Sequence, residues 1–282
     1  MMRIIEKVTE MQKLMDSLKC RGKTIGLVPT MGALHEGHLY LVKYAVRESE
    51  VVVVSIFVNP LQFGQDEDYK KYPRTLNNDS SLCEKEKVDV LFCPSVQELY
   101  PVKPLTYIDM MGLTDKLCGK SRAGHFRGVC TVVGKLFNII KPHNAYFGQK
   151  DYQQFIVIKQ MVDDLNFNVK LKMCPIVREK DGLALSSRNR YLSPAERKQA
   201  LCLKEALDKA KYLIRNRKEK KASNVINEMK KVIERQPFSR IDYIEVCDSE
   251  TLEKITLIKG KALVALAVFI GKTSLIDNDV IS

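Results

Sequence analysis

The chain has 282 residues, 45% of them hydrophobic and 28% charged, with a formal net charge of +12, as expected for a globular protein of one large or two modest domains. The longest apolar run, Ala262–Ile270, is too short for a membrane-spanning helix and the N-terminus lacks a signal-peptide pattern, so we predict a cytoplasmic protein without a membrane partner. Eight cysteines occur without a C-x-x-C pair, which argues against a zinc site.

Short apolar runs alternate with amphipathic segments over the first 178 residues. Strands are predicted at Thr24–Pro29, Val51–Val58, Val88–Cys93, Ala145–Phe147 and Val169–Cys174. Helices are predicted at Leu39–Glu48, Leu76–Glu86, Thr131–Ile140 and Asp151–Leu165. This alternation indicates right-handed βαβ units in a doubly wound parallel sheet, an α/β fold of the Rossmann type, in which ligands bind beyond the carboxyl ends of the strands.

The segment Pro29–His38 joins the first predicted strand to a helix through a turn that contains glycine. Backbone amides at such a turn can face phosphate oxygens. His35 and His38 are three residues apart, so their imidazoles lie on the same side of the first helical turn. Gly37 between them has no Cβ and allows close approach of a backbone or a base. We therefore expect this turn to hold a nucleoside triphosphate and to supply donors for nucleotidyl transfer.

Two further polar segments follow the second strand and precede the third helix. Gln62 offers a carboxamide suited to a substrate hydroxyl or carboxylate, and an ordinary turn residue is the alternative. The segment Arg122–Gly128 places two guanidinium groups, the His125 imidazole and two glycines within seven residues. That density is typical of anion binding, and a basic loop docked on an acidic surface is the alternative.

Polar residues also surround the last predicted helix of this region. Lys150 in its first turn can reach a phosphate, Asp151 can accept from ribose hydroxyls, and Gln154 lies one turn further on the same face. The alternative is a capped helix with an exposed lysine. In the following loop, two hydroxyls and a guanidinium at residues 186–188 suit a mobile clamp on a triphosphate, or only a surface loop.

A smaller α+β domain is predicted over residues 179–282. Ser193 is the expected N-cap of a helix with Pro194 at its first position and Glu196 three residues after the cap. Residues 196–235 hold thirteen Lys or Arg and six Asp or Glu on two predicted amphipathic helices, broken near residues 216–223. Aromatic residues do not alternate with these lysines, so solvated faces are favoured over nucleic-acid binding. Strands are predicted at Arg240–Val246 and Lys261–Ile270.

Together these segments resemble the pantothenate synthetase, or pantoate–β-alanine ligase, family. Six motifs match in order, and the C-terminal segment is also similar: Pro29–His38, Phe57–Gly64, Tyr72–Thr75, Gly124–Gly128, Tyr146–Gln154, Asp181–Tyr191 and the ending Gly271–Asn278. The resemblance implies an AMP-forming ligase that uses ATP and Mg²⁺. Pantoate would first form pantoyl adenylate with release of pyrophosphate, and the β-alanine amine would then expel AMP. It also implies a homodimer, with residues 1–178 binding ATP and pantoate and residues 179–282 acting as a lid.

The resemblance also implies roles for individual residues. His38, the implied proton donor, and His35 would be catalytic. The implied ATP contacts are Met31, Gly32, Ala33, Leu34, His35, Glu36, Gly37, His38, Gly148, Gln149, Lys150, Asp151, Val177, Leu185, Ser186, Ser187 and Arg188. Substrate contacts are implied at Gln62, Gln154, Arg122 and His125, and a position near Mg²⁺ at Asp79.

Two departures from the family pattern are visible. Gln149 stands where many relatives have Glu, and Asn77 and Asn78 stand where relatives often have acidic residues. Neither changes the expected reaction class. The alternatives are another nucleotidyltransferase of the same fold, such as a cytidylyltransferase or a small class I tRNA-synthetase-like enzyme, and an RNA-binding protein that uses the basic helices.

Overall fold

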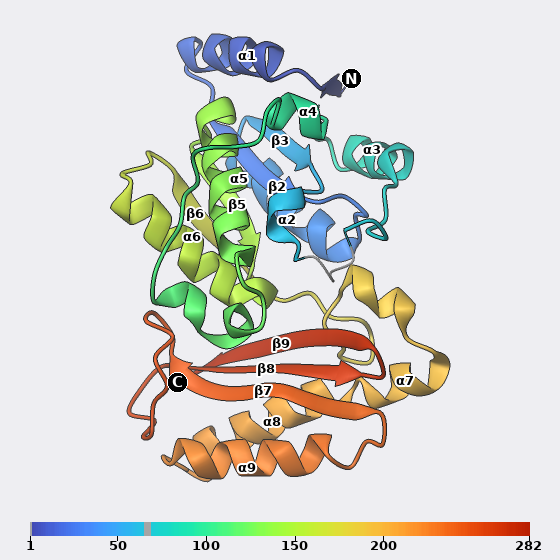
Figure 1. The fold of residues 1–282 in the computed structure, drawn as a ribbon, viewed down its shortest axis with the longest axis vertical. Coiled ribbons are helices and arrows are strands. Elements are labelled where there is room, and N and C mark those ends of the chain that lie inside the picture. The colour runs from blue at the N-terminus through green and yellow to red at the C-terminus, as the bar shows by residue number, and fades with distance from the viewer. Residues whose placement is uncertain (1, 65–68) are drawn as a thin grey trace. The chain divides into compact units, whose positions relative to one another are not determined.

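The computed structural model describes residues 2–64 and 69–282, which form two compact units (Figure 1). The first unit covers the described residues up to Thr114, with Ser121–Gln149 and Gln154–Pro175. The second covers Asp115–Lys120, Lys150–Gln153 and Ile176–Ser282. The second unit thus includes two short segments that precede the predicted boundary at residue 178.

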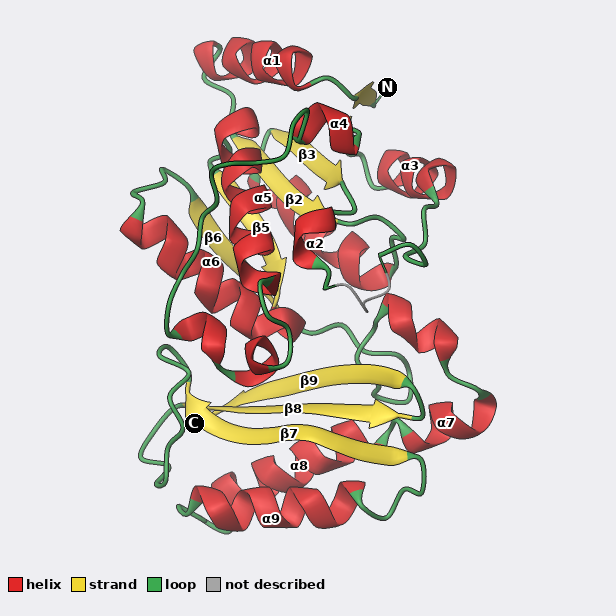
Figure 2. Ribbon diagram, in the orientation of Figure 1, coloured by secondary structure: helices red, strands yellow, loops and turns green. Residues whose placement is uncertain are grey.

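The first unit contains a six-stranded parallel sheet in the order β1-β4-β3-β2-β5-β6, of which β2, β3, β5 and β6 are labelled in Figure 2. Its strands are β1 Arg3–Ile5, β2 Ile25–Thr30, β3 Val51–Ile56, β4 Val90–Phe92, β5 Asn144–Gly148 and β6 Lys170–Cys174. The five predicted strands are confirmed with shifted ends. β1 was not predicted, because a strand of three residues shows almost no periodicity.

Helices of the first unit cover both faces of this sheet. They are α1 Val8–Cys20, α2 Glu36–Glu48, α3 Leu76–Lys85, α4 Val96–Leu99, α5 His125–Ile140 and α6 Tyr152–Asp164, with the 3₁₀ turn η1 Pro60–Gln62. The first two residues of α6 and the last two of the 3₁₀ turn η4 Gln149–Asp151 belong to the second unit. Val28 and Val52 pack with α2 on one face, while Leu27 and Val53 point to the other, and all four are buried. A parallel sheet buried on both faces is the predicted doubly wound α/β fold.

The strand order reverses direction between β2 and β5. β3 and β4 extend the sheet on one side of β2, whereas β5 and β6 extend it on the other. β2 pairs directly with β5, with Leu27 opposite Ala145. The segments that follow β2 and β5 therefore leave the sheet at the topological switch point, where ligands bind in open α/β sheets.

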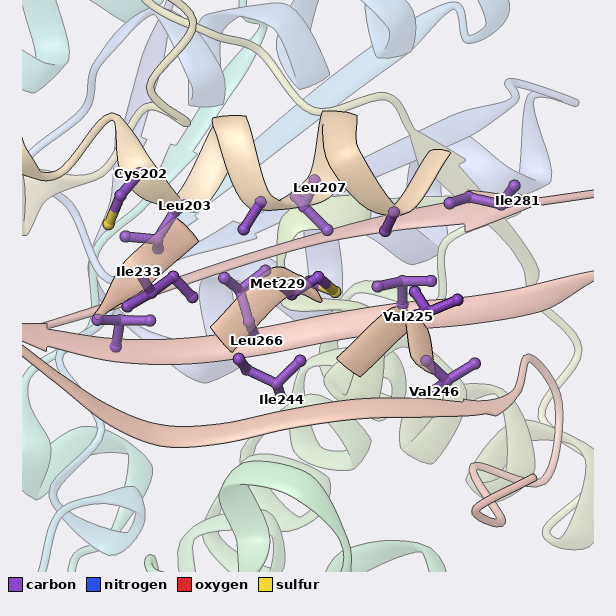
Figure 3. Close-up of a cluster of buried hydrophobic side chains, with 14 of the residues drawn as sticks. Cys202, Leu203, Leu207, Val225, Met229, Ile233, Ile244, Val246, Leu266 and Ile281 are labelled. Atoms are coloured by element: carbon purple, nitrogen blue, oxygen red, sulfur yellow. The ribbon is translucent and has the colours of Figure 1, made fainter. Parts of the chain in front are cut away.

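The second unit contains the antiparallel sheet β7-β8-β9 covered by helices. Its elements are η5 Ser187–Tyr191, α7 Pro194–Gln199, α8 Cys202–Arg215, α9 Ala222–Ile233, β7 Ser239–Asp248, β8 Ala262–Ile270 and β9 Thr273–Ile281, with η2 Leu113–Asp115 starting in the first unit and η3 Leu117–Lys120. Leu207 of α8 and Met229 of α9 pack against Ile244 and Leu266 of the sheet (Figure 3). The two basic helices are thus amphipathic, as predicted.

In this unit the predicted helix cap at Ser193 is confirmed, whereas one strand was not predicted. Ser193 caps α7 as predicted, because its side chain accepts from the Glu196 amide and Glu196 accepts from the Ser193 amide. β9 was not predicted, since Asp277 and Asn278 are poor strand formers. Among the described residues, no helix has the length and hydropathy needed to cross a bilayer.

Candidate active site

The turn between β2 and α2, residues 31–38, is here called the histidine turn. His35 is the N-cap of α2, and its Nδ1 accepts a hydrogen bond from the Gly37 amide at 3.1 Å. Nδ1 of His38 accepts from the His35 amide at 3.4 Å, and the two ring centroids lie 4.1 Å apart. A neutral imidazole whose Nδ1 accepts carries its proton on Nε2. Each ring therefore presents an Nε2–H donor.

Asp79 of α3 holds the start of the histidine turn. Its carboxylate is fully buried and accepts from the amides of Ala33 and Leu34, both at 2.9 Å, and from the Thr75 hydroxyl at 3.2 Å. Gly32 and Ala33 have φ values of +81° and +52°, so the backbone here adopts a conformation that needs support. These contacts make Asp79 a positioning residue for the turn.

The backbone amides of the histidine turn were expected to face phosphate oxygens, but three of them are bonded within the protein. Those of Ala33 and Leu34 donate to Asp79, and that of Gly32 donates to the Thr30 hydroxyl at 3.1 Å. Ala33 and Leu34 are also buried side chains of the core, whereas Glu36 is exposed. Buried amides need partners, and here the protein supplies them. These amides are therefore engaged within the protein, and the imidazoles of His35 and His38 are the candidate donors to an anion.

Gln62 lies in a buried hydrogen-bond network after β3. Asn59 donates to Oε1 of Gln62 at 3.1 Å and to the Gly128 carbonyl at 3.0 Å, while Nε2 of Gln62 donates to Sδ of Met31 at 3.1 Å. The Tyr100 hydroxyl donates to Oδ1 of Asn59 at 3.1 Å, and burial raises the pKa of Tyr100, which keeps this donor protonated. Sequence reasoning gave no role to Asn59 or Tyr100, although Asn59 stands beside the predicted site.

His125 and Arg122 extend this network, which we call the carboxamide network (Asn59, Gln62, Tyr100, Arg122 and His125). His125 begins α5 and is 8% exposed. Its Nδ1 lies 2.8 Å from the Gln62 carbonyl oxygen, and its Nε2 lies 3.0 Å from Nη1 of Arg122. Because guanidinium only donates, Nε2 is the acceptor and Nδ1–H donates to Gln62. The structure thus brings three predicted substrate residues together and joins them to the histidine turn through Met31.

A cavity of about 270 Å³ lies at the carboxyl ends of β2, β3 and β4 in the first unit. Among the described residues it is lined by Met31 and Gly32 of the histidine turn, by Asp79, and by Phe57 and Arg74. Its position agrees with the expected ligand side of the sheet. Hydrophobic walls with few polar groups are typical of small-molecule sites.

The segment after β5 forms η4 before α6 begins at Tyr152. Lys150 and Asp151 therefore lie in a 3₁₀ turn and not in the first turn of the helix, which corrects the predicted helix start at Asp151. Such turns often precede α-helices. Gly148 and Gln149 belong to the first unit together with Gln154, whereas Lys150 and Asp151 belong to the second.

The remaining predicted residues form a compact loop in the second unit. The Leu185 amide donates to the Val177 carbonyl at 3.0 Å, and the Ser186 hydroxyl accepts from the Arg188 amide at 3.3 Å, which caps η5. Lys150 and Ser186 line the same small cavity in this unit. The structure therefore places the predicted lysine and the predicted serine loop beside each other.

Comparisons with known proteins identify the family of this chain. The sequence model of the family described as Pantoate-beta-alanine ligase matches residues 3–280. The pantothenate synthetase of Thermotoga petrophila is 55% identical over 280 residues, covering 99% of this chain and 100% of the relative. The crystal structure of pantothenate synthetase from Thermus thermophilus has a TM-score of 0.93 and 42% identity, with 99% of each chain covered. That of the Francisella tularensis pantoate-beta-alanine ligase, complexed with beta-gamma ATP and beta-alanine, has a TM-score of 0.82 and 38% identity, covering 99% of this chain and 98% of the other. The chain therefore belongs to the pantoate–β-alanine ligase family.

Proposed function

We propose that this protein is an ATP-dependent ligase that condenses pantoate with β-alanine to pantothenate through pantoyl adenylate. Family membership over residues 3–280 supports the reaction class. The observation that carries the proposal is the joining of the His35–His38 pair to the carboxamide network through Met31. The proposed phosphate donors, His35 and His38, and the proposed pantoate contacts of the carboxamide network then lie side by side in the first unit.

In the first step, a pantoate carboxylate oxygen attacks the α-phosphorus of ATP, and the bond from that phosphorus to the bridging oxygen of pyrophosphate breaks. Negative charge grows on the phosphate oxygens as this bond breaks. The Nε2–H groups of His35 and His38 are donors oriented in advance by their Nδ1 contacts, so they stabilise this charge without reorganisation. Further ATP contacts proposed in the first unit are Met31, Gly32, Glu36, Gly37, Gly148 and Gln149. Ala33 and Leu34 are buried and bonded to Asp79, so they support the turn instead.

In the second step, the neutral amine of β-alanine attacks the acyl carbon of pantoyl adenylate. The bond from this carbon to the phosphate oxygen breaks, AMP leaves, and the amine loses a proton as the amide forms. The Francisella relative, whose structure is named as a complex with beta-gamma ATP and beta-alanine, supports both as substrates. Adenylation is required because AMP is a far better leaving group than oxide.

Gln62 is the proposed anchor for pantoate. Its carboxamide has two N–H groups and two acceptor sites, of which Met31 and Asn59 each engage one. One donor and one acceptor remain for a hydroxyl and a carboxylate. His125, Arg122 and Gln154 are proposed as further substrate contacts, and the link between His125 and the Gln62 backbone supports this grouping.

The implied Mg²⁺ does not fit the position of Asp79. Both carboxylate oxygens of Asp79 accept from backbone amides in a fully buried setting, whereas Mg²⁺ requires exposed, near-octahedral oxygen ligands. Groups of three or more His, Cys, Asp or Glu arranged to hold a metal do not occur within residues 2–64 and 69–282. No step of the proposed reaction is therefore assigned to a metal ion held by Asp79.

The test is pantoate-dependent exchange of labelled pyrophosphate into ATP. We expect exchange with ATP and pantoate alone, without β-alanine, because the adenylate forms before the amine reacts. Pantothenate should appear by mass spectrometry once β-alanine is added. Exchange that is equally fast without pantoate would refute the proposal, and exchange with CTP in place of ATP would favour the cytidylyltransferase alternative.

The contacts proposed for ATP in the second unit are Lys150, Asp151, Val177 and the segment Leu185–Arg188. The homodimer, the cytoplasmic location, the absence of a nucleic-acid partner and the lid role of residues 179–282 stay predictions. Gel filtration of the purified chain with light scattering tests the dimer directly.

A further inference from the structure

Strand β9 carries a buried polar pair that the proposed chemistry has not used. Asp277 is 2% exposed and Asn278 is 4% exposed. Charged and amide side chains are seldom this buried unless specific partners satisfy them. Both belong to the C-terminal segment that resembles the family ending, for which the sequence suggested no role. Their partners therefore show what this segment does.

Asn278 holds the turn that presents Lys150. Its Nδ2 donates to the Lys150 carbonyl at 2.9 Å, across 128 positions of the sequence. Lys150 lies in the 3₁₀ turn η4, whose hydrogen bonds are poorer than those of an α-helix. A bond from a buried strand therefore sets where the Lys150 side chain begins.

Asp277 holds the loop that leads to Ser186. Its two carboxylate oxygens accept from both terminal nitrogens of Arg178, at 2.6 and 3.0 Å, and Nη1 of Arg178 also donates to the Gly182 carbonyl at 3.0 Å. Arg178 forms a β-bridge with Ala184, so the two sides of the loop are tied together. Bidentate pairs of this kind restrict orientation as well as distance.

The two anchored segments meet within the second unit. Lys150, Ser186, Asn189 and Asp277 all line a cavity of about 10 Å³, which is too small for more than one water molecule. Close packing of this kind restricts the movement of Lys150 relative to the segment Leu185–Arg188. Neighbouring residues on one strand therefore set the geometry of both segments.

We propose that Asp277 and Asn278 are positioning residues for ATP, which place Lys150 and the segment Leu185–Arg188 in one fixed arrangement for adenylation. This inference rests on the proposed function and adds residues that act through others. Its consequence is selective. Loss of the contacts made by Asp277 or Asn278 weakens ATP binding. Pantoate binding depends on the carboxamide network of the first unit and is unaffected.

The experiment compares the KM values for ATP and for pantoate in the pyrophosphate exchange of Asn278→Leu. We expect the KM for ATP to rise about tenfold, as for loss of one hydrogen bond that leaves a partly buried carbonyl unpaired, while the KM for pantoate stays within about twofold. The matched control is Asp279→Asn on the same strand, which removes only the partly exposed contact to Lys211 at 3.5 Å. Its two KM values should equal those of the wild type.

A second variant protects the test against misfolding. Asp277→Asn keeps the size of the side chain and weakens the pair with Arg178, so the same selective rise in the KM for ATP is expected. A folded variant with unchanged kinetics, or equal rises in both KM values, overturns the inference. Absence of pantoate-dependent exchange in the wild type would instead refute the proposed function, so the two failures are distinguishable.

Discussion

At the residue scale, the two imidazoles of the histidine turn are defined by the partners of their Nδ1 atoms. The Gly37 and His35 amides donate to these atoms. The same two hydrogen bonds therefore cap α2 and fix the proton of each ring on Nε2. Asp79 stabilises the start of the histidine turn by accepting hydrogen bonds from the Ala33 and Leu34 amides. We therefore expect the two imidazoles to be oriented toward the departing pyrophosphate before ATP binds.

The change His38→Ala removes one of these donors. We expect pantoate-dependent pyrophosphate exchange to fall by roughly 10²–10⁴-fold, the usual range for a general acid. Because His38 also contributes to the cap of α2, thermal unfolding of the variant should be measured in parallel. Near-normal exchange in a folded variant would remove His38 from the mechanism.

The change Asp79→Asn distinguishes positioning from metal binding. An amide has only one carbonyl acceptor, so one buried amide of the turn loses its partner, and the free energy of unfolding should fall by about 1–3 kcal/mol. Exchange should fall as well, and raising the Mg²⁺ concentration should not restore it. Restoration by Mg²⁺ would show that Asp79 acts as a metal ligand instead.

At the element scale, the close approach of α5 to η1 places Gln62. A Cβ on Gly128 would lie 2.3 Å from the Leu61 carbonyl oxygen, so only glycine allows this contact. Asn59 uses the same approach when it donates to the Gly128 carbonyl. The position of Gln62, the proposed pantoate contact, is thus decided by the packing of α5 on η1.

Gly128→Ala should therefore act on substrate binding. The methyl group displaces η1 and with it Gln62, and the KM for pantoate should rise at least about tenfold, since small displacements in a site are costly. Gly134→Ala in the same helix is the matched control, because the close contact of its methyl group is with the tip of the Ile108 side chain, which can move, and Phe167 lies at an ordinary 3.8 Å. Equal kinetics for the two variants would contradict this account.

The amino ends of β2 and β5 are joined by a histidine outside the site. Nδ1 of His143 accepts from the Ile25 amide at 2.9 Å, and burial lowers the pKa of His143 below its ordinary value of about 6.5. The unfolded chain thus binds a proton more readily, so stability is present above pH 6.5 and is lost as the pH falls through the folded-state pKa. Urea unfolding of His143→Gln should show a weaker loss between pH 7 and pH 5 than the wild type; equal losses would exclude His143 as the cause.

At the scale of the whole molecule, the basic charge and the proposed chemistry occupy different elements. The basic residues of the segment 196–235 lie on α7, on the solvated faces of α8 and α9, and in the segments that flank these helices. The apolar faces of α8 and α9 form the core shown in Figure 3. The proposed site residues belong to other segments. We therefore expect the charge of this segment to have no part in the proposed reaction.

Reversal of two exposed charges tests this separation. Lys220→Glu combined with Lys221→Glu should leave ligase turnover within about twofold of the wild type, as for other surface substitutions. The measurement is pantothenate formation at saturating substrates. RNA binding that disappears with the change while turnover is unaltered would support the RNA-binding alternative. A large loss of turnover would instead show that these charges take part in the ligase reaction.

Much of the fold and part of the site were predictable. Hydrophobic periodicity predicted all the parallel strands except β1, and local capping signals predicted the start of α7, because both depend on neighbours in sequence. The pairing of His35 with His38 was predictable for the same reason. The 3₁₀ turn at Lys150, strand β9 and the roles of Asn59 and Tyr100 were not, because packing overrode weak local preferences.

The amino-acid sequence by itself determined the alternation of strands and helices, the family, and the placing of two histidines after a central strand. Only the tertiary structure decided which atoms meet. Asp79 reaches the Ala33 amide across 46 positions, and Asn278 reaches Lys150 across 128. Neither bond is visible in local sequence, because a hydrogen bond between distant residues exists only after packing has brought a buried donor and its acceptor together.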